Sequence, residues 1–560
     1  MNNINYKCQH LIYLNYAFSF SSRCFVILAE SQSLESLIMA HSNRRKFVKN
    51  LGAIIAAGAA ADLSLGASPY KPTSQLTSQL TPNLVPYPAP GVYKPGKTFV
   101  GIQMSPHTML DEGIDRCLDL CQSSAGVNAV FPYSHAFHTS TLGKPLRDLA
   151  KDHGVVPRDL RNKVPGVWVK HNDKYFSETS LRIKPTDPSL EFAGRDLFSE
   201  IRKPADRRGM KVFARILESS GLYIENFNKV LTVDTYGNPG RSACWSNPDY
   251  ANFWKATVTD MFNRYDLDGF QWGAERMGPL MNIILPWNNN APGCFCQHCI
   301  ERGKASNIDP GRAREGYRLL FEYVQKLMTD APKPPEGVFT IFLRHIMRYP
   351  EILSWEYLYR QSREDIQKGM YTSIKAIKPD AVVGWHVDHQ PSSWDIVYRA
   401  EMSYEEMAPY SDYIKLILYH EVLGPRIRSW YLDRFKKTIL SEISLEQSLE
   451  LYYALFGYDK NVEPGVDKLS SEGFSPDYVY RETRRSVASA NGKTKIFAGI
   501  GIDVPGSPPD DPETVYQATL KALQANAGGI VISREYEEMK VPNLEAIGRA
   551  VKTWDIMSGL

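Results

Sequence analysis

The sequence has little that would suit a nucleic-acid-binding or membrane-spanning protein. Its 560 residues contain 65 Lys and Arg against 62 Asp and Glu, a formal net charge of only +3, and no stretch alternates basic with aromatic residues. Nucleic-acid binding therefore has little support, because such proteins concentrate basic charge on one surface. After residue 68, no apolar run reaches the roughly 18 residues of a membrane-spanning helix. We expect a mature protein that is soluble and binds neither nucleic acid nor membrane.

A second absence concerns serine nucleophiles. No G-x-S-x-G motif occurs in the chain, which excludes the nucleophile elbow of α/β-hydrolases. Aromatic residues, in contrast, are plentiful at 11%, with 31 Tyr and 10 Trp. That composition suits a cleft in which side chains stack on sugar rings, although aromatic residues are equally common in protein cores.

The N-terminal part predicts an export signal. The basic segment "SNRRKFVKN", with Arg44 and Arg45, precedes the small-residue run "LGAIIAAGAAADLSLGAS", a pattern typical of twin-arginine signals. The alternative is an ordinary basic helix start. We expect residues 1–67 to be an upstream extension and signal, 68–96 a Pro/Ser/Thr-rich linker and 97–560 a catalytic domain. A bacterial periplasmic or secreted protein, exported by the twin-arginine machinery, is the corresponding prediction.

Eight short apolar runs rich in β-forming residues follow the linker and are separated by helical stretches. Continuous apolar strands alternating with helices are typical of parallel strands covered on both faces, and eight of them match the (β/α)₈ TIM barrel. We expect long inserted loops after strands 2, 4 and 6; a doubly wound open sheet is the alternative. The runs are 98–105, 128–135, 211–218, 267–275, 381–389, 413–421, 495–503 and 528–537.

Polar side chains end nearly every run, where barrels place their chemistry. Glycoside cleavage needs one carboxylic acid that protonates the leaving oxygen and one carboxylate that attacks the sugar or activates water. We expect Glu275 as acid/base and Asp503 as nucleophile or base, with Glu421 and Glu535 in reserve for the second role. In an amylase-like arrangement, Glu275 would instead be the nucleophile. The expected substrate-binding residues are Tyr133, His135, Arg215, Trp272, Arg276, His386, His389, Glu421 and Glu535.

Four cysteines have the spacing of a metal site. Cys294, Cys296 and Cys299 lie in "GCFCQHC", and Cys244 lies about fifty residues upstream. Four thiolates suit a closed tetrahedral Zn²⁺ site, which is structural because it has no open position. A disulfide from Cys244 to one of the trio and free thiols are the alternatives.

The segment around these cysteines resembles a known family. From "CWSNPDY" through "DGFQWGAERMGP" to "CFCQHCIERG", about 60 residues are similar to the family 42 β-galactosidases and related hypothetical glycosyl hydrolases. In those proteins, a cysteine before strand four joins a C-x-C-x-x-C after it to bind zinc, and strand four ends in the general acid/base Glu. The resemblance implies a glycosidase with Glu275 in that role. The chain departs from the family at Ala274, where the family has Asn, and at Asp503, where that clan has Glu.

Two other functions remain compatible with the sequence. A carbohydrate-binding barrel that has lost catalysis would explain Ala274 and Asp503. A metal-dependent hydrolase or isomerase could use His386, Asp388 and His389 in "GWHVDH", since alternating strand residues share a face.

Overall fold

The computed structural model describes residues 96–137, 152–156, 158–218 and 221–559. The predicted extension, export signal and nearly all of the predicted linker lie outside these residues. All of the described residues belong to one compact unit, Val85–Leu560.

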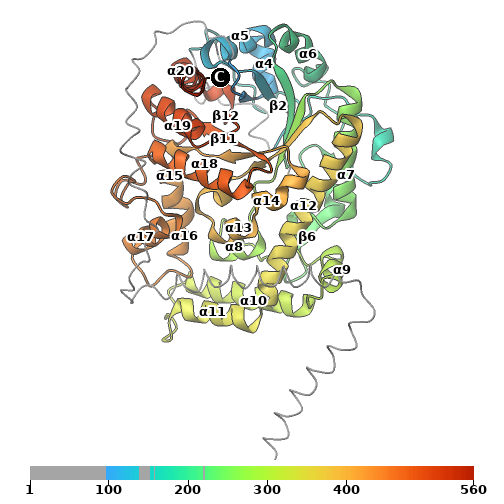
Figure 1. Ribbon diagram of the computed structural model, residues 1–560. Coiled ribbons are helices and arrows are strands. Elements are labelled where there is room, and N and C mark those ends of the chain that lie inside the picture. The colour runs from blue at the N-terminus through green and yellow to red at the C-terminus, as the bar shows by residue number, and fades with distance from the viewer. Residues whose placement is uncertain (1–95, 138–151, 157, 219–220, 560) are drawn as a thin grey trace, which may run out of the picture. The chain divides into compact units, whose positions relative to one another are not determined.

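Eight parallel strands close into a barrel, in which each strand pairs with its sequence neighbours and the last pairs with the first (Figure 1). Each predicted apolar run contains one strand. The (β/α)₈ barrel is therefore confirmed, and the open-sheet alternative is wrong because the first and last strands are hydrogen-bonded in register, Gly101 opposite Val531. The strands are β1 (Val100–Met104), β2 (Ala129–His135), β4 (Lys211–Leu217), β8 (Gly269–Gly273), β9 (Val382–Val387), β10 (Tyr413–Ile417), β11 (Lys495–Gly501) and β12 (Gly529–Ser533).

Helices cover the outside of the barrel and pack on their neighbours around it. Local signals set their ends: α7 starts behind Asn247, whose side chain accepts a hydrogen bond from the Asp249 amide, with Pro248 in the first position. The longest helix ends at Ile377, two residues before Pro379, which disfavours helical geometry in the residue ahead of it. The covering helices are α5 (Ile114–Ala125), α6 (Leu197–Arg207), α7 (Pro248–Arg264), α12 (Glu351–Ile377), α18 (Pro476–Ala490), α19 (Pro512–Gln524) and α20 (Val541–Ser558).

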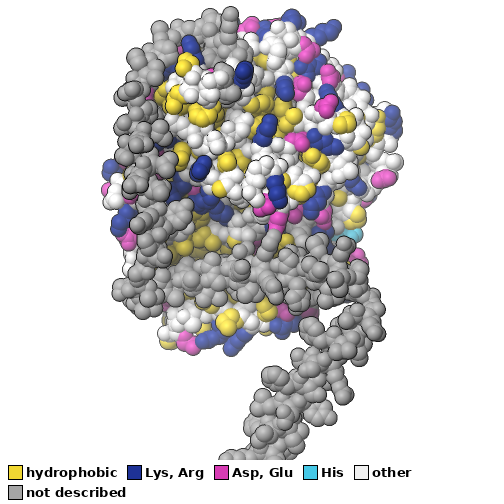
Figure 2. All heavy atoms as spheres, in the orientation of Figure 1, with side chains coloured by type: hydrophobic (Ala, Val, Ile, Leu, Met, Phe, Trp, Pro, Cys, Tyr) yellow, Lys and Arg dark blue, Asp and Glu magenta, His cyan; other side chains and the backbone are white. Residues whose placement is uncertain are grey.

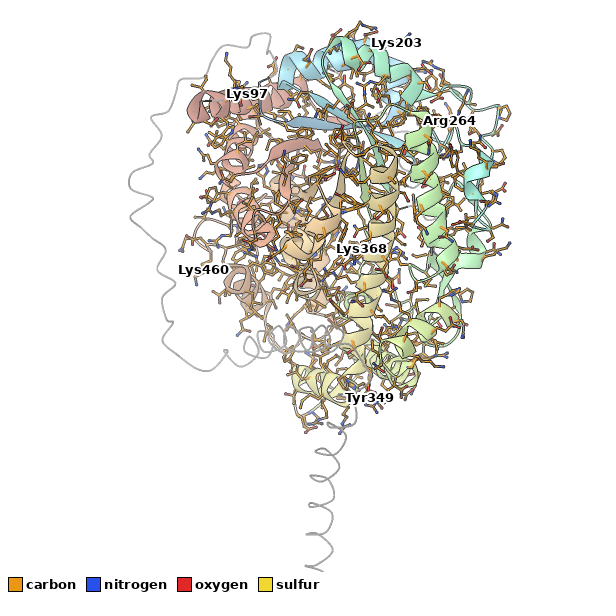
Figure 3. All side chains as sticks on the ribbon, turned by 45° about the vertical axis from the view of Figure 1, so that its right-hand side comes forward. Lys97, Lys203, Arg264, Tyr349, Lys368 and Lys460 are labelled. Atoms are coloured by element: carbon orange, nitrogen blue, oxygen red, sulfur yellow. The ribbon has the colours of Figure 1, made fainter. Side chains whose placement is uncertain are left out.

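The longest connections follow the second, fourth and sixth strands, as the spacing predicts. The fourth carries its own helices, which gather at one end of the barrel (Figure 1). In Figure 3, Tyr349 lies at that end, just ahead of α12, and Lys203 on α6 lies at the other. The further helices are α4 (Pro106–Glu112), α8 (Pro279–Ile284), α9 (Gln297–Ala305), α10 (Pro310–Leu327), α11 (Val338–Arg348), α13 (Ile396–Glu401), α14 (Tyr404–Met407), α15 (His420–Arg426), α16 (Asp433–Phe435) and α17 (Leu445–Phe456).

The sequence does not predict two short antiparallel sheets outside the barrel. One pairs β3 (Arg182–Ile183) with β5 (Ile224–Glu225), which are separated by α6 and β4, and the other is a hairpin of β6 (Leu231–Val233) and β7 (Pro239–Ala243). The β6–β7 hairpin ends at the residue before Cys244, so it carries the first cysteine of the predicted metal site.

Inside the barrel, aromatic rings fill the half nearest the strands' N-terminal ends. The rings of Phe131 and Phe213 stack at 4.4 Å, those of Phe99 and Phe497 at 4.5 Å, and that of Tyr413 lies 4.6 Å from Phe497. We call these five residues the aromatic layer. Because it closes one end of the barrel, any internal cavity must open at the C-terminal ends of the strands.

On the face shown in Figure 2, basic and acidic side chains are interspersed rather than gathered by sign. Among the described residues, no helix combines the length and the apolar character that crossing a bilayer requires.

Candidate active site

A cavity of about 610 Å³ lies at the C-terminal ends of the barrel strands. Its wall combines strand ends with residues of the long third, fourth and sixth connections. Six of the residues expected from the sequence line it, namely Tyr133, Arg215, Glu275, Arg276, His386 and Glu535.

Three polar side chains, Glu275, His386 and Lys415, are linked in a row that ends at the cavity with Glu275. His386 Nε2 lies 2.9 Å from Glu275 Oε1, and His386 Nδ1 lies 3.5 Å from Lys415 Nζ. With the lysine donating to Nδ1, the imidazole carries its proton on Nε2 and donates it to the glutamate. Burial, followed by the charge of Lys415, lowers the pKa of His386 to about 4. The ring is therefore neutral at pH 7 and fixes the direction of the Glu275 carboxylate.

Glu275 is ionised in this setting. Burial raises its pKa, but the hydrogen bond from His386 and the charges of His386, when protonated, Arg215 and Arg426 outweigh burial and hold the pKa below its usual value. Its side chain keeps 28% of its surface exposed, towards the cavity. The carboxylate is thus charged and accessible at once.

Asp388 is the second carboxyl group of the cavity with a shifted pKa. Burial, followed by the charge of Glu275, raises this pKa to about 7. Its Oδ1 accepts a hydrogen bond from the His389 amide at 2.5 Å, and its Oδ2 accepts one from Gln390 Nε2 at 3.0 Å. Two carboxyl groups on one cavity, with pKa values moved in opposite directions, are the arrangement that supplies one proton donor and one anion at neutral pH.

Glu535 faces the same space from the end of β12. Its Oε1 accepts a hydrogen bond from Arg215 Nη1 at 3.0 Å, and the Arg215 guanidinium lies 4.1 Å above the Tyr133 ring. Both members of this ion pair are buried. Arg215 and Glu535 thus form a buried ion pair in the same cavity wall as Glu275.

Arg276 lines the cavity, but its hydrogen bonds point away into the protein. It donates to Glu218 Oε1 and to the Ala243 carbonyl, both at 2.8 Å, and its guanidinium lies 3.9 Å from the Trp245 ring. This side chain fixes the segment next to Cys244.

The structure does not bring Asp503 to the cavity. Its Oδ2 accepts hydrogen bonds from the Lys540 amide at 2.8 Å and from Asn543 Nδ2 at 3.0 Å, and its Oδ1 lies 3.0 Å from Lys540 Nζ. Asp503 therefore holds the start of α20. Glu421, its expected reserve, also lies outside the cavity: it is buried on α15, with Oε1 2.9 Å from His420 Nδ1.

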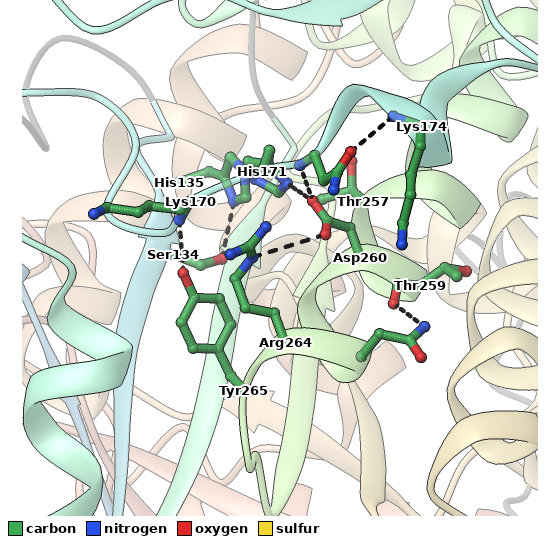
Figure 4. A network of polar contacts seen from close by, with 12 residues as sticks. Ser134, His135, Lys170, His171, Lys174, Thr257, Thr259, Asp260, Arg264 and Tyr265 are labelled. Carbon is green, nitrogen blue, oxygen red and sulfur yellow. Dashed lines mark hydrogen bonds and ion pairs between the residues drawn. The ribbon is translucent and has the colours of Figure 1, made fainter.

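His135 is likewise buried away from the cavity. Its Nε2 lies 2.9 Å from His171 Nε2, and His171 Nδ1 lies 2.8 Å from Asp260 Oδ2. Figure 4 shows this network between the end of β2 and α7. Burial lowers the pKa of His135 well below its usual value, so the ring is a neutral link between elements.

Trp272 and His389 are core residues too. The Trp272 ring meets that of Trp254 edge to face at 5.9 Å and has no exposed surface, so it is no platform for a sugar. His389 accepts a hydrogen bond from Arg426 Nη1 at 2.8 Å and lies 3.2 Å from the Tyr478 hydroxyl. With both ring nitrogens engaged, His389 lacks a free position for a metal.

Several residues of the site lie away from the strand ends. Lys415, which contacts His386 but does not line the cavity, could have been found from the sequence, because it is a lysine inside the apolar strand "YIKLI". The others come from helical connections or hairpins, whose approach to the cavity only the fold reveals. They are Arg241, Tyr359, Arg426, Trp287 and Trp430.

The four predicted cysteines meet in space. Their sulfur atoms all lie within 4.8 Å of one another, and no other group of three or more His, Cys, Asp or Glu ligands was found among the described residues. Cys244 Sγ lies 3.4 Å from Cys299 Sγ, far from the roughly 2.05 Å of a disulfide, and all four are free thiols. Tetrahedral Zn²⁺ with Zn–S bonds near 2.3 Å would place its sulfurs about 3.8 Å apart, so the group fits such an ion.

One further motif is explained by its context. The letters "GVYKPGKT" at 91–98 match the phosphate-binding pattern G-x-x-x-x-G-K-[ST]. That pattern works between a strand and the N-terminus of a helix, whose amides hold the phosphates. Here its last residues run directly into β1, and the first five lie outside the described residues. The match carries no phosphate site.

Comparison with known proteins finds likeness only in structure. No family model matches the chain, and no curated protein resembles it in sequence. The solved structures that it resembles are glycoside hydrolases built as (β/α)₈ barrels.

One is the β-galactosidase of the psychrophilic Marinomonas ef1, at 11% identity and a TM-score of 0.43 over 82% of this chain and 60% of that one. A second is the glycoside hydrolase domain of PgaB (BpsB) from Bordetella bronchiseptica, at 13% identity and a TM-score of 0.42 over 82% of this chain and 98% of that one. A third is the β-amylase catalytic domain of Paenibacillus polymyxa, at 10% identity and a TM-score of 0.41 over 83% of this chain and 100% of that one. This chain spans less than two thirds of the β-galactosidase. These likenesses concern the fold alone.

Proposed function

We propose that this chain is an exported glycoside hydrolase whose active site is the cavity around Glu275. The observation that carries the proposal is the pair Glu275 and Asp388, two carboxyl groups on one cavity whose pKa values are shifted in opposite directions. Glycoside cleavage requires this combination of an acid and an anion. An oligosaccharide or a simple glycoside is the corresponding substrate class.

Within this proposal, Glu275 supplies the carboxylate that attacks the anomeric carbon or activates water, and Asp388 protonates the leaving oxygen. This assignment differs from the sequence-based one, in which Glu275 is the acid/base and Asp503 its partner. The reasons are the low pKa of Glu275 and the position of Asp503 at the start of α20. Glu535 is the alternative carboxylate, because it also faces the cavity and is paired with Arg215.

His386 and Lys415 act on the carboxylate without touching the sugar. The lysine fixes the imidazole tautomer, and the imidazole holds Glu275 Oε1, leaving the other oxygen to the substrate. Both are positioning residues for Glu275.

We further propose that the four cysteines bind a structural Zn²⁺. Cys244 follows the hairpin that brings Arg241 and Ser242 to the cavity, and Cys294 follows residues 287–293, most of which line it. A metal joining the two segments would hold both parts of the wall. When bound, the ion supplies rigidity, and the chemistry stays with the carboxyl groups.

Export remains part of the proposal and depends on Arg44, Arg45 and the small-residue run behind them. A periplasmic or secreted hydrolase would meet extracellular polysaccharide fragments.

The test is a panel of aryl glycosides and natural oligosaccharides, assayed with the wild type, Glu275→Gln and Asp388→Asn. We expect both variants to lose at least about 10²-fold in kcat/KM on the best substrate. Asp503→Asn is the matched control, since it removes a strand-end carboxylate outside the cavity. If wild type and Glu275→Gln turn over every substrate at equal rates, the proposal fails; sugar binding without turnover would identify a carbohydrate-binding barrel.

A further inference from the structure

The cavity wall holds more arginine than the proposed cleavage needs. Arg215 pairs with Glu535, Arg276 with Glu218 and Arg534 with Glu538. The other two, Arg241 and Arg426, have no carboxylate within 4 Å among the described residues. The five arginines of the wall are Arg215, Arg241, Arg276, Arg426 and Arg534.

Arg426 is the arginine of the wall on which the inference mainly rests. It comes from the end of α15, its guanidinium lies 4.6 Å from the Trp430 ring, and its Nη1 donates to His389 Nδ1 at 2.8 Å. That acceptor is neutral, because burial and the charge of Arg426 itself lower the pKa of His389 well below its usual value. Arg426 is half-buried, and the charges of Glu275 and Asp388 act on it only at longer range, without an ion pair within 4 Å among the described residues. Its guanidinium can therefore form a paired contact with a further anion that enters the cavity.

A second guanidinium faces the same space. Arg534 follows β12 with a positive φ of 40°, and its charge helps burial to lower the pKa of Arg426. Its Nε lies 3.3 Å from Glu538 Oε2, and 33% of its side chain is exposed. Two cations that repel each other across a cavity form a good site for carboxylate or sulfate, which arginine binds through paired N–H donors.

Indole rings adjoin the same part of the wall. Trp430 meets Trp287 edge to face at 4.8 Å, both line the cavity, and Trp287 is 42% exposed. Exposed tryptophan beside a polar cavity offers an apolar face to a sugar ring. The wall thus presents an exposed indole ring near the guanidinium groups of Arg426 and Arg534.

We infer that the substrate is an anionic saccharide, whose carboxylate or sulfate group is bound by Arg426 and Arg534 while its ring packs against the exposed Trp287. The inference rests on the proposed function, since it concerns the same cavity. Uronic acids and sulfated hexoses share the required chemistry.

The test uses calorimetric binding to the Glu275→Gln variant. Its probes are short hexuronic acid oligosaccharides against the same compounds with their carboxyl groups reduced to alcohols, and sulfated galactose oligosaccharides against their desulfated forms. We expect one anionic form to bind about 10- to 100-fold tighter than its neutral counterpart, as loss of a charged hydrogen-bonded contact predicts. Arg426→Gln should abolish this difference, and rising salt should shrink it.

Arg428→Gln is the control, because this arginine lies two residues along, pairs with Asp433 and does not line the cavity. Should Arg426→Gln fail to fold, Arg534→Gln provides the same comparison. Equal binding of the charged and neutral forms, or no binding of any anionic form, would overturn the inference and leave the hydrolase proposal standing. Arginine-dependent binding of the anion without wild-type turnover of any substrate would instead overturn the hydrolase.

Discussion

In the barrel interior, the N-terminal halves of the strands carry aromatic core residues, and the C-terminal halves carry charged and polar residues of the candidate active site. On β4, Phe213 belongs to the aromatic layer and Arg215, two residues on, lies in the cavity wall. On β10, Tyr413 belongs to the aromatic layer and Lys415 lies beneath Glu275 and His386. Since alternate strand residues share a face, the residue two positions after each aromatic core residue also points into the barrel, and on these two strands it belongs to the candidate active site. We call Arg215, Glu275, His386, Asp388, Lys415 and Glu535 the charged layer.

The two layers have opposite energetics. The aromatic layer gains stability from burial and ring contacts. The charged layer holds a lysine and a histidine whose pKa values burial lowers, so its groups are kept at a cost to folding, as active-site groups commonly are. Substitutions in the first layer should therefore affect stability, and those in the second should affect activity.

The largest expected effect is that of Glu275→Gln. We expect kcat/KM to fall by about 10⁴-fold, because the reacting carboxylate is lost, while the melting temperature stays equal or rises. Steady-state kinetics and calorimetry on the same preparation check both statements. A variant that melts early and keeps its activity would place Glu275 with the packing residues.

Phe213→Ala probes the other layer. Removing this buried ring should lower the free energy of unfolding by about 3–5 kcal/mol, with kcat at low temperature within tenfold of wild type. Denaturant titration measures the first quantity, and an assay well below the melting temperature measures the second. Loss of activity at unchanged stability would contradict the division into layers.

Lys415→Met should separate positioning from folding. We expect kcat to fall about 10- to 100-fold, because His386 loses the donor that fixes its tautomer. Stability should hold or increase, since a buried amine is replaced by an apolar side chain. Lys495→Met, on an exposed position of β11, is the control. If KM alone changes, Lys415 binds substrate rather than positioning His386.

The smallest effect on catalysis should follow metal removal. Metal analysis should find about one zinc per chain, lost on Cys296→Ser but kept on Cys121→Ser, which alters a buried cysteine outside the group. KM should then rise more than kcat falls, because the zinc would hold cavity wall segments and not the carboxyl groups. Loss of kcat at unchanged KM would argue for a catalytic metal.

The sequence predicted the barrel well, because each parallel strand is a continuous apolar run that periodicity reveals. It predicted the cysteine group for a similar reason, since three of the four cysteines lie within six residues. The position of Glu275 and His386 at the cavity followed from their places at strand ends, while their roles stay a proposal. Asp503 occupies an equivalent place, yet its backbone adopts a φ of +52° and its carboxylate turns to α20, a choice that only three-dimensional contacts define.

The arginine and tryptophan residues of the wall escaped prediction because they belong to connections. Arg426 and Trp430 lie on helical segments after β10, and Arg241 lies on a hairpin. Nothing in their local pattern distinguishes them from solvent-exposed residues. Their role depends on how a long loop folds back over the barrel, which short-range signals do not encode.

The most direct test of the central claim is the pH profile of kcat/KM for wild type and Asp388→Asn, which reports the free enzyme's essential groups. Asp388 must be protonated to act as the acid, so wild-type activity should decline as pH rises through about 7. Glu275 must be ionised, and its pKa is lowered, so loss from this group should occur only at a pH below the usual range of a glutamate. The account predicts that Asp388→Asn abolishes the alkaline decline and is most impaired on substrates with poor leaving groups. An unchanged alkaline limb in the variant would contradict it.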